Sequence, residues 1–224
     1  MRITIINQFY PPDISPTGKL AASLANHRAA LGDDVTIIAG HGYVRQADSE
    51  ETNSHKRVRL QRAWFPQLGK STLLRRCIDY LVFIFTATCR VILLPRQDVV
   101  ICLTTPPYIV CLGVLHKVCF RQTKIILWNM DCYPEAAERA GVLRPGGKIS
   151  SLLQVLNRWL NGWIDHVVCL DEAMRNLILR RGNSDFSRHS TSVIPNWETM
   201  TQYPSPIGES LPAANHAFTI LYSG

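Results

Sequence analysis

The feature that most constrains the fold is a repeated succession of short β-branched runs, each followed by apolar residues at helical spacing. These strand-like runs lie at 2–6, 34–39, 58–64, 98–103, 124–128, 166–170 and 191–194. The clearest helical patterns lie at 17–31, 71–94 and 149–164. Most of the strand-like runs are apolar without alternation, which is typical of parallel strands buried on both faces. The sequence therefore predicts an α/β fold, a Rossmann-like parallel sheet with helices on both faces.

Composition and net charge indicate which kinds of fold and partner are possible. Hydrophobic residues make up 46% of the chain and charged residues 18%, so a large core is available and disorder is excluded. Lysine and arginine outnumber aspartate and glutamate by 24 to 17, which gives a net charge of +7 and favours an anionic partner. The densest basic run, residues 55–62, has no interleaved aromatic residues, so we expect no nucleic-acid binding. The run is interpreted as a solvated strand edge or a contact with phosphate or a lipid headgroup.

No metal or cofactor is expected. The seven cysteines include no CxxC pair and no close Cys/His cluster, so we interpret them as small apolar residues, mostly buried. A Walker A loop ending at Gly69-Lys70-Ser71 fails because Trp64 stands where glycine is needed. A dinucleotide fingerprint starting at Gly40 fails because Arg45 takes the place of its last glycine.

Two apolar stretches are candidates for a membrane span, and both are too short. Asp79 and Arg90 bracket only ten uncharged residues, and Pro106-Pro107 interrupts 99–115, where we expect a strand, a turn and a helix that begins at the prolines. No secretory signal precedes the first strand, so a cytoplasmic protein is expected. Residues 78–85 are unusually apolar, which leaves two alternatives, contact with a membrane surface or packing on the sheet. The apolar stripe of 149–164, which includes Trp159 and Trp163, is expected to be core, with contact to a membrane or a partner as the alternative.

Three polar segments follow predicted strands, where parallel sheets bind ligands. The loop at 9–19 leads to a helix N-terminus, where Thr17, Gly18 and Lys19 could receive an anion. Asp131 and Glu135 follow the run at 124–128, and Asp131 could bond sugar hydroxyls, accept a proton or serve only as a helix cap. Asn196 follows the run at 191–194.

These segments together resemble the N-terminal half of the family 4 retaining glycosyltransferases, which have the GT-B fold. The family opening "YPP(D/E)" corresponds to Tyr10-Pro-Pro-Asp13, and its "LaxxGHeVtvi" corresponds to Leu31–Ile38. Motifs of the branch that makes bacterial surface polysaccharide are also present. They are Asp131-Cys-Tyr-Pro-Glu135, Ala140-Gly-Val-Leu143, Ile194-Pro-Asn-Trp197 and Leu221-Tyr-Ser-Gly224.

The resemblance implies transfer of a sugar from a nucleotide-diphosphate sugar, with retention, to a lipid-linked saccharide at the inner face of the plasma membrane. Thr17, Gly18 and Lys19 would face the donor diphosphate or the acceptor. Asp131 and Glu135 would contact acceptor hydroxyls, and Asn196 would be a further substrate-binding residue. Because the leaving phosphate can itself take the acceptor proton in such enzymes, Asp131 is only a candidate catalytic residue.

The resemblance also implies a division of the chain. Residues 1–195 would form the acceptor-binding domain, 196–217 an interdomain linker, and 218–224 the first strand of a donor-binding domain. The family's two glutamates eight residues apart are absent from the sequence, so this chain alone is expected to transfer no sugar. The alternatives are a non-catalytic binding or anchoring subunit of a split enzyme, and half of another GT-B enzyme such as a nucleotide-sugar epimerase.

Overall fold

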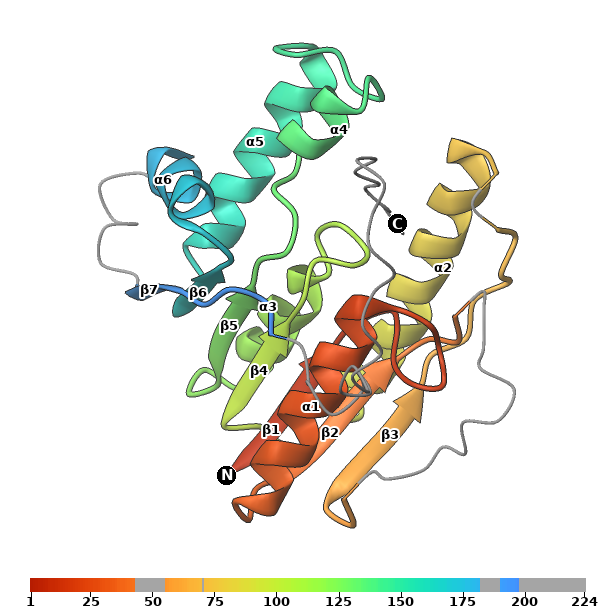
Figure 1. Ribbon diagram of the computed structural model, residues 1–224, viewed down its shortest axis with the longest axis vertical. Helices are drawn as coiled ribbons and strands as arrows, with labels where there is room; N and C mark the ends of the chain where they lie inside the picture. Colours follow the sequence, from red (N-terminus) through yellow and green to blue (C-terminus); the bar gives the residue numbers. More distant parts are fainter. Residues whose placement is uncertain (43–54, 70, 182–189, 198–224) are drawn as a thin grey trace, which may run out of the picture.

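Seven parallel strands form one sheet in the computed structural model of the chain, in the order β3-β2-β1-β4-β5-β6-β7 (Figure 1). The strands are β1 (Arg2–Ile6), β2 (Asp34–Ala39), β3 (Val58–Arg62), β4 (Val99–Cys102), β5 (Lys124–Trp128), β6 (His166–Cys169) and β7 (Ser190–Val193). The structure describes residues 1–42, 55–69, 71–181 and 190–197. The predicted linker and final strand, from 198 on, lie outside them. The predicted fold class is confirmed.

Helices cover both faces of this sheet (Figure 1). They are α1 (Pro16–Ala30), α2 (Leu73–Ile92), α3 (Val110–Cys119), α4 (Glu135–Arg139), α5 (Lys148–Asn161) and α6 (Glu172–Arg181). Alternate residues of each strand point to opposite faces, so Ile5 and Ile37 pack with α1 while Ile6 and Ile38 pack with α2 and α3. This double burial explains why the strands are apolar without alternation.

Three predicted element ends are wrong by a few residues. The helix predicted over 71–94 begins at Leu73 and is capped by Thr72, whose side chain accepts from the Arg75 N–H. The predicted helix after β4 begins at Val110 and not at the prolines, because residues 104–109 form a bend and a turn before the helix starts. The helix predicted over 17–31 ends at Ala30, and Leu31 is its exposed C-cap.

Helix α2 is apolar on two opposite sides. Its core side carries Phe83, Ala87 and Val91 at a spacing of four residues. At 100° per residue, the opposite side is an equally regular row of exposed apolar residues. We call this row the α2 outer stripe: Leu74, Ile78, Leu81, Phe85 and Ile92. The sequence left packing and membrane contact as alternatives for 78–85, and the structure gives a packed face and an uncovered one.

Helix α5 departs from its prediction as core. Leu160 is buried, and Leu156 and Trp163 pack partly against the core. Ile149, Leu152, Val155 and Trp159 are exposed instead. Helical spacing shows that residues share a face, but it does not show whether another element covers that face.

We expect Phe83→Ala to lower the free energy of unfolding by about 3 kcal/mol or more, because it empties a fully buried site. Phe85→Ala, two residues along the same helix, is the matched control. Its side chain is 71% exposed, so we expect a change within about 0.5 kcal/mol. Urea unfolding of both variants measures the difference, and equal losses would contradict the two-sided description of α2.

Candidate functional site

The polar side chains identified after the strands gather at the carboxyl edge of the sheet, where β1 and β4 are neighbours. The chain reverses its direction of winding between these strands, and such a point is where open α/β sheets bind ligands. The Gln8 N–H donates to the Thr105 carbonyl at 2.8 Å, which joins the loop after β1 to the loop after β4. Thr104 Oγ1 accepts from the backbone N–H groups of Met130 and Asp131 at 3.2 and 3.1 Å, which joins β4 to the loop after β5.

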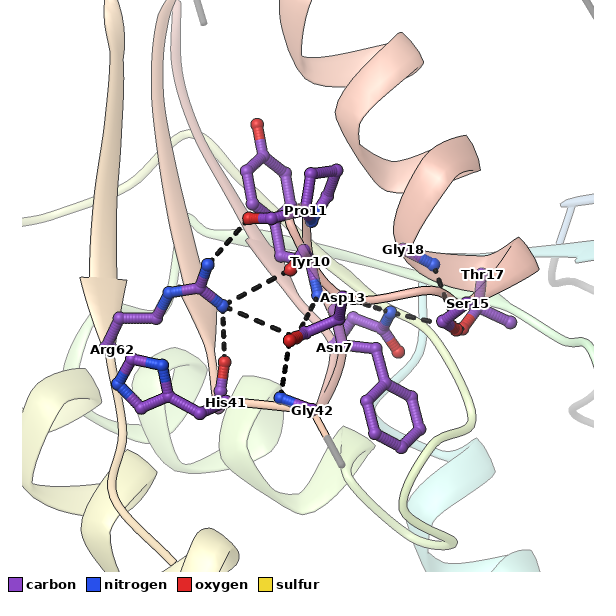
Figure 2. A network of polar contacts seen from close by, with 12 residues as sticks. Asn7, Tyr10, Pro11, Asp13, Ser15, Thr17, Gly18, His41, Gly42 and Arg62 are labelled. Atoms are coloured by element: carbon purple, nitrogen blue, oxygen red, sulfur yellow. Dashed lines mark hydrogen bonds and ion pairs between the residues drawn. The ribbon is translucent and has the colours of Figure 1, made fainter. Parts of the chain in front are cut away.

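The loop between β1 and α1 is held by Arg62, the last residue of edge strand β3 (Figure 2). Its guanidinium donates to the carbonyls of Tyr10, Pro11 and Gly40, and lies 3.6 Å from the Asp13 carboxylate. Arg62 therefore makes its contacts inside the site. For this one residue, the interpretation of the 55–62 run as a solvated strand edge or a contact with phosphate or a lipid headgroup is wrong.

Asp13 is buried and completes the same network. Its carboxylate accepts from the Gly42 N–H at 2.6 Å and from the Tyr10 N–H at 3.3 Å (Figure 2). A Cβ atom at position 42 would stand 2.5 Å from the Asp13 side chain, so only glycine fits there. The loop is thus tied to the ends of both β2 and β3.

The predicted anion loop is held by hydrogen bonds at the start of α1. Ser15 is the N-cap and accepts from the Gly18 N–H, while Thr17 Oγ1 lies 3.0 Å from Ser15 Oγ and 3.4 Å from Asn7 Nδ2 (Figure 2). Gly18 is required by packing, since its Cβ would meet the Phe9 backbone at 3.2 Å. Ligand approach is therefore not needed to explain that glycine.

The side chains of Lys19 and Asn196 are exposed, and neither takes part in the hydrogen-bond networks described around Asp13 and Thr17. Asn196 precedes Trp197, whose ring stacks on Trp128 with centroids 5.2 Å apart and whose Nε1 donates to Ser23 on α1. The segment after β7 thus crosses back over the sheet edge and fixes Asn196 on the α1 side.

Asp131 and Glu135 have different surroundings. Glu135 forms an ion pair with Arg181 of α6, which also donates to the Tyr133 carbonyl at 3.1 Å. Asp131 makes no ion pair among the described residues, and its partial burial raises the pKa of its carboxyl. A carboxylate with a raised pKa and no cationic partner is better suited to accept a proton than one paired with arginine.

Asp131 borders two hollows of very different size. One, between the ends of β4 and β5 and helix α5, has a volume of about 50 Å³, which is enough for water but not for a sugar. The other lies between α4 and α6 and has a volume of about 600 Å³, within the usual range for ligand sites. No group of three metal-ligating side chains occurs among the described residues.

The comparisons with known proteins assign this architecture. A family model described as "Glycosyl transferase 4-like domain" matches residues 17–197. The chain belongs to that family. The family domain spans α1 to Trp197 and so contains the predicted motifs from Thr17 to Asn196. No curated protein matches the chain.

Two solved structures are distantly similar to this glycosyl transferase 4-like domain. A UGT transferase from Siraitia grosvenorii in complex with UDP matches at a TM-score of 0.45 and 10% identity, over 86% of this chain and 50% of its own. The C-terminal domain of the coenzyme A biosynthesis bifunctional protein CoaBC matches at 0.34 and 14%, over 62% of this chain and 67% of its own. The domain thus spans half the length of the first structure.

Sequence reasoning missed the roles of Arg62, Thr104 and Arg181 in this domain. Asp13 was part of the quoted "YPPD" motif, but its partner is 49 positions along the chain. One signal was present in the sequence. Because β3 is parallel to β1, its last residue must reach the edge where the first loop lies.

Arg62→Met tests the network. We expect it to lower the free energy of unfolding by about 3 kcal/mol, because the buried Asp13 carboxylate loses its charged partner. Arg59→Met, an exposed position on the same strand, should change it by less than about 0.5 kcal/mol. Urea unfolding measures both, and amide exchange should quicken at Gly42 and Tyr10 only in the first variant. Unchanged exchange there would show that Arg62 does not hold the loop.

Proposed function

We propose that this chain is the acceptor-binding half of a retaining glycosyltransferase that moves a sugar from a nucleotide-diphosphate sugar to a lipid-linked saccharide in surface polysaccharide synthesis. Residues 1–195 are the acceptor-binding domain, 196–217 the linker and 218–224 the start of a donor-binding domain. Family membership gives the transferase class. The observation that carries the lipid-linked acceptor is the uncovered α2 outer stripe beside the ligand-binding edge.

The α2 outer stripe begins near the carboxyl edge of the sheet. Helix α2 starts near the carboxyl end of β3 and runs back along the sheet, so its first turns lie toward the site edge and the stripe continues away from it (Figure 1). Helix α5, with exposed Ile149 and Leu152 in its first turns, packs on the same face of the sheet as α2. A row of exposed apolar residues such as the α2 outer stripe is typical of an interaction surface.

Charge favours an anionic lipid surface as the occupant. Arg75 is exposed at the start of α2, next to Leu74, and Lys148 is exposed at the start of α5. The whole chain carries a net charge of +7. An apolar helix face flanked by cations is what binds in the plane of an anionic membrane. Among the described helices, none is long and apolar enough to cross a bilayer.

Within this function, Asp131 is the candidate that contacts the acceptor hydroxyl, and the α1 N-terminus with Thr17, Gly18 and Lys19 faces the diphosphate of the donor or the acceptor. Glu135 acts through Arg181, which its carboxylate holds against the Tyr133 carbonyl. Asn196 lies at the entrance to the linker. The protein works on the cytoplasmic face of the membrane, without a nucleic-acid partner.

We expect the purified chain to sediment with vesicles of phosphatidylethanolamine and phosphatidylglycerol. Leu81→Glu with Phe85→Glu should weaken this binding by more than about tenfold, because two apolar side chains leave the lipid. Leu31→Glu is the matched control, an equally exposed leucine at the opposite edge of the sheet, and should bind as the parent does. Equal binding of the double variant and the parent would contradict the membrane assignment.

The split-subunit alternative predicts the same surface, so activity decides between the two. We expect the chain alone to transfer no sugar from nucleotide-diphosphate sugars to a polyprenyl-diphosphate saccharide in vesicles, since the sequence lacks the glutamate pair. Product is measured with a radiolabelled donor. Transfer by the purified chain would overturn this expectation. Activity restored by adding a second chain from the same cells would favour the split enzyme.

A further inference from the structure

The larger hollow beside Asp131 is built from two helices and two strand ends. Helix α4 supplies Glu135, Ala136 and Arg139 along one wall. Helix α6 supplies the facing wall with Ala173, Met174, Asn176, Leu177 and Arg180. The floor comes from the loops after β5 and β6 and includes Asp131 and Asp171. We call this hollow the α4–α6 cleft.

Two arginines in the α4–α6 cleft have no carboxylate partner among the described residues. They are Arg139 on α4 and Arg180 on α6. Their neighbours on α6 differ in this respect. Arg175 is paired with Glu172, and Arg181 with Glu135. The cleft therefore offers two available guanidinium groups, one from each wall. Each guanidinium group can bind two oxygens of a carboxylate or phosphate through parallel N–H bonds.

No carboxylate of the cleft forms an ion pair with these two cations. Glu135 is paired with Arg181 instead. Asp171 accepts from the Met174 N–H at 2.6 Å, a hydrogen bond that orients the carboxylate but does not neutralise it. Asp131 also lines the cleft and makes no ion pair among the described residues. The cleft thus contains two arginines available to an anion and two aspartates, of which Asp131 is available as a hydrogen-bond acceptor.

The rest of the lining suits a sugar. Met174, Leu177 and Ala136 give the walls apolar patches, against which the C–H faces of a pyranose ring can pack. The volume of about 600 Å³ accommodates a saccharide together with an anionic substituent. A neutral sugar alone would leave both guanidinium groups without a partner.

We propose that the α4–α6 cleft binds the anionic portion of the acceptor saccharide, with Arg139 and Arg180 on the anion and Asp131 on a ring hydroxyl. The inference rests on the proposed function and deepens it, because it selects an acceptor that carries charge close to the reacting sugar. The shared chemistry is an oxyanion, either the phosphate that joins sugar to lipid or a carboxylate on the sugar itself.

The test is binding of four probes to the purified chain, followed by NMR at the Ala136 and Ala173 amides in the cleft walls. The probes are glucose, glucose 1-phosphate, glucuronic acid and inorganic diphosphate. We expect an anionic sugar to bind about tenfold more tightly than glucose. Tighter binding of glucose 1-phosphate assigns the anion to a phosphate, and tighter binding of glucuronic acid assigns it to a carboxylate.

Variants locate the site. Arg139→Gln and Arg180→Gln should each weaken binding of the anionic sugar by about tenfold. Arg158→Gln is the matched control, an exposed arginine on α5 that does not line the cleft, and should leave binding unchanged. The proposal is overturned if anionic probes leave both alanine amides unshifted, if glucose binds equally well, if diphosphate alone binds as tightly as the sugars, or if the two variants bind as the parent does.

The outcome is separable from that of the proposed function. Vesicle binding depends on the α2 outer stripe and not on the cleft, so it should persist in Arg139→Gln and Arg180→Gln. Retained vesicle binding with no anion binding in the cleft would remove this inference and leave the membrane-bound acceptor in place. Anion binding in the cleft without vesicle binding would overturn the membrane-bound acceptor and leave an anion site that is not assigned to a lipid-linked saccharide.

Discussion

The parallel direction of all the strands is the constraint on which the site depends. Parallel neighbours need crossover helices on the faces of the sheet, and every carboxyl end then meets at one edge. Residues that are far apart in sequence, such as Asp13 and Arg62, become partners only because β1 and β3 end at that edge. One guanidinium then fixes three carbonyls and a carboxylate, so the first loop is positioned by the last residue of an edge strand.

The same constraint explains which features could be predicted. Strand positions and fold class follow from apolar runs, which are local, and most boundaries agree within two residues. The Thr72 cap and the late start of α3 depend on backbone turns that composition does not determine. The positions of Asp131 and Thr17 at the carboxyl edge were predictable because both belong to segments that follow strands, while their roles as site residues stay predictions. Arg181 was not, because its role comes from the contact between α6 and the loop that contains Tyr133.

Burial was the least predictable property. The spacing of Leu152 and Trp159 showed a shared face correctly, yet no element of the described chain covers them. In α2, two apolar rows lie opposite one another, and only the row with Phe83 meets the sheet. Folding needs only one apolar face of a helix, the face that packs on the core. A second, exposed apolar face therefore indicates an interaction surface.

The exposed apolar face of α2 and the positive charge of the chain both favour contact with an anionic lipid surface. A membrane surface would hold the α2 outer stripe and the start of α5, which lie on the same face of the sheet. An acceptor anchored in lipid would then meet the α4–α6 cleft without free diffusion in water. Its reacting sugar would lie near the carboxylate, while Arg139 and Arg180 would hold the anion. The binding energy of the lipid and of the anion would thus position the acceptor hydroxyl, which by itself contributes little binding energy.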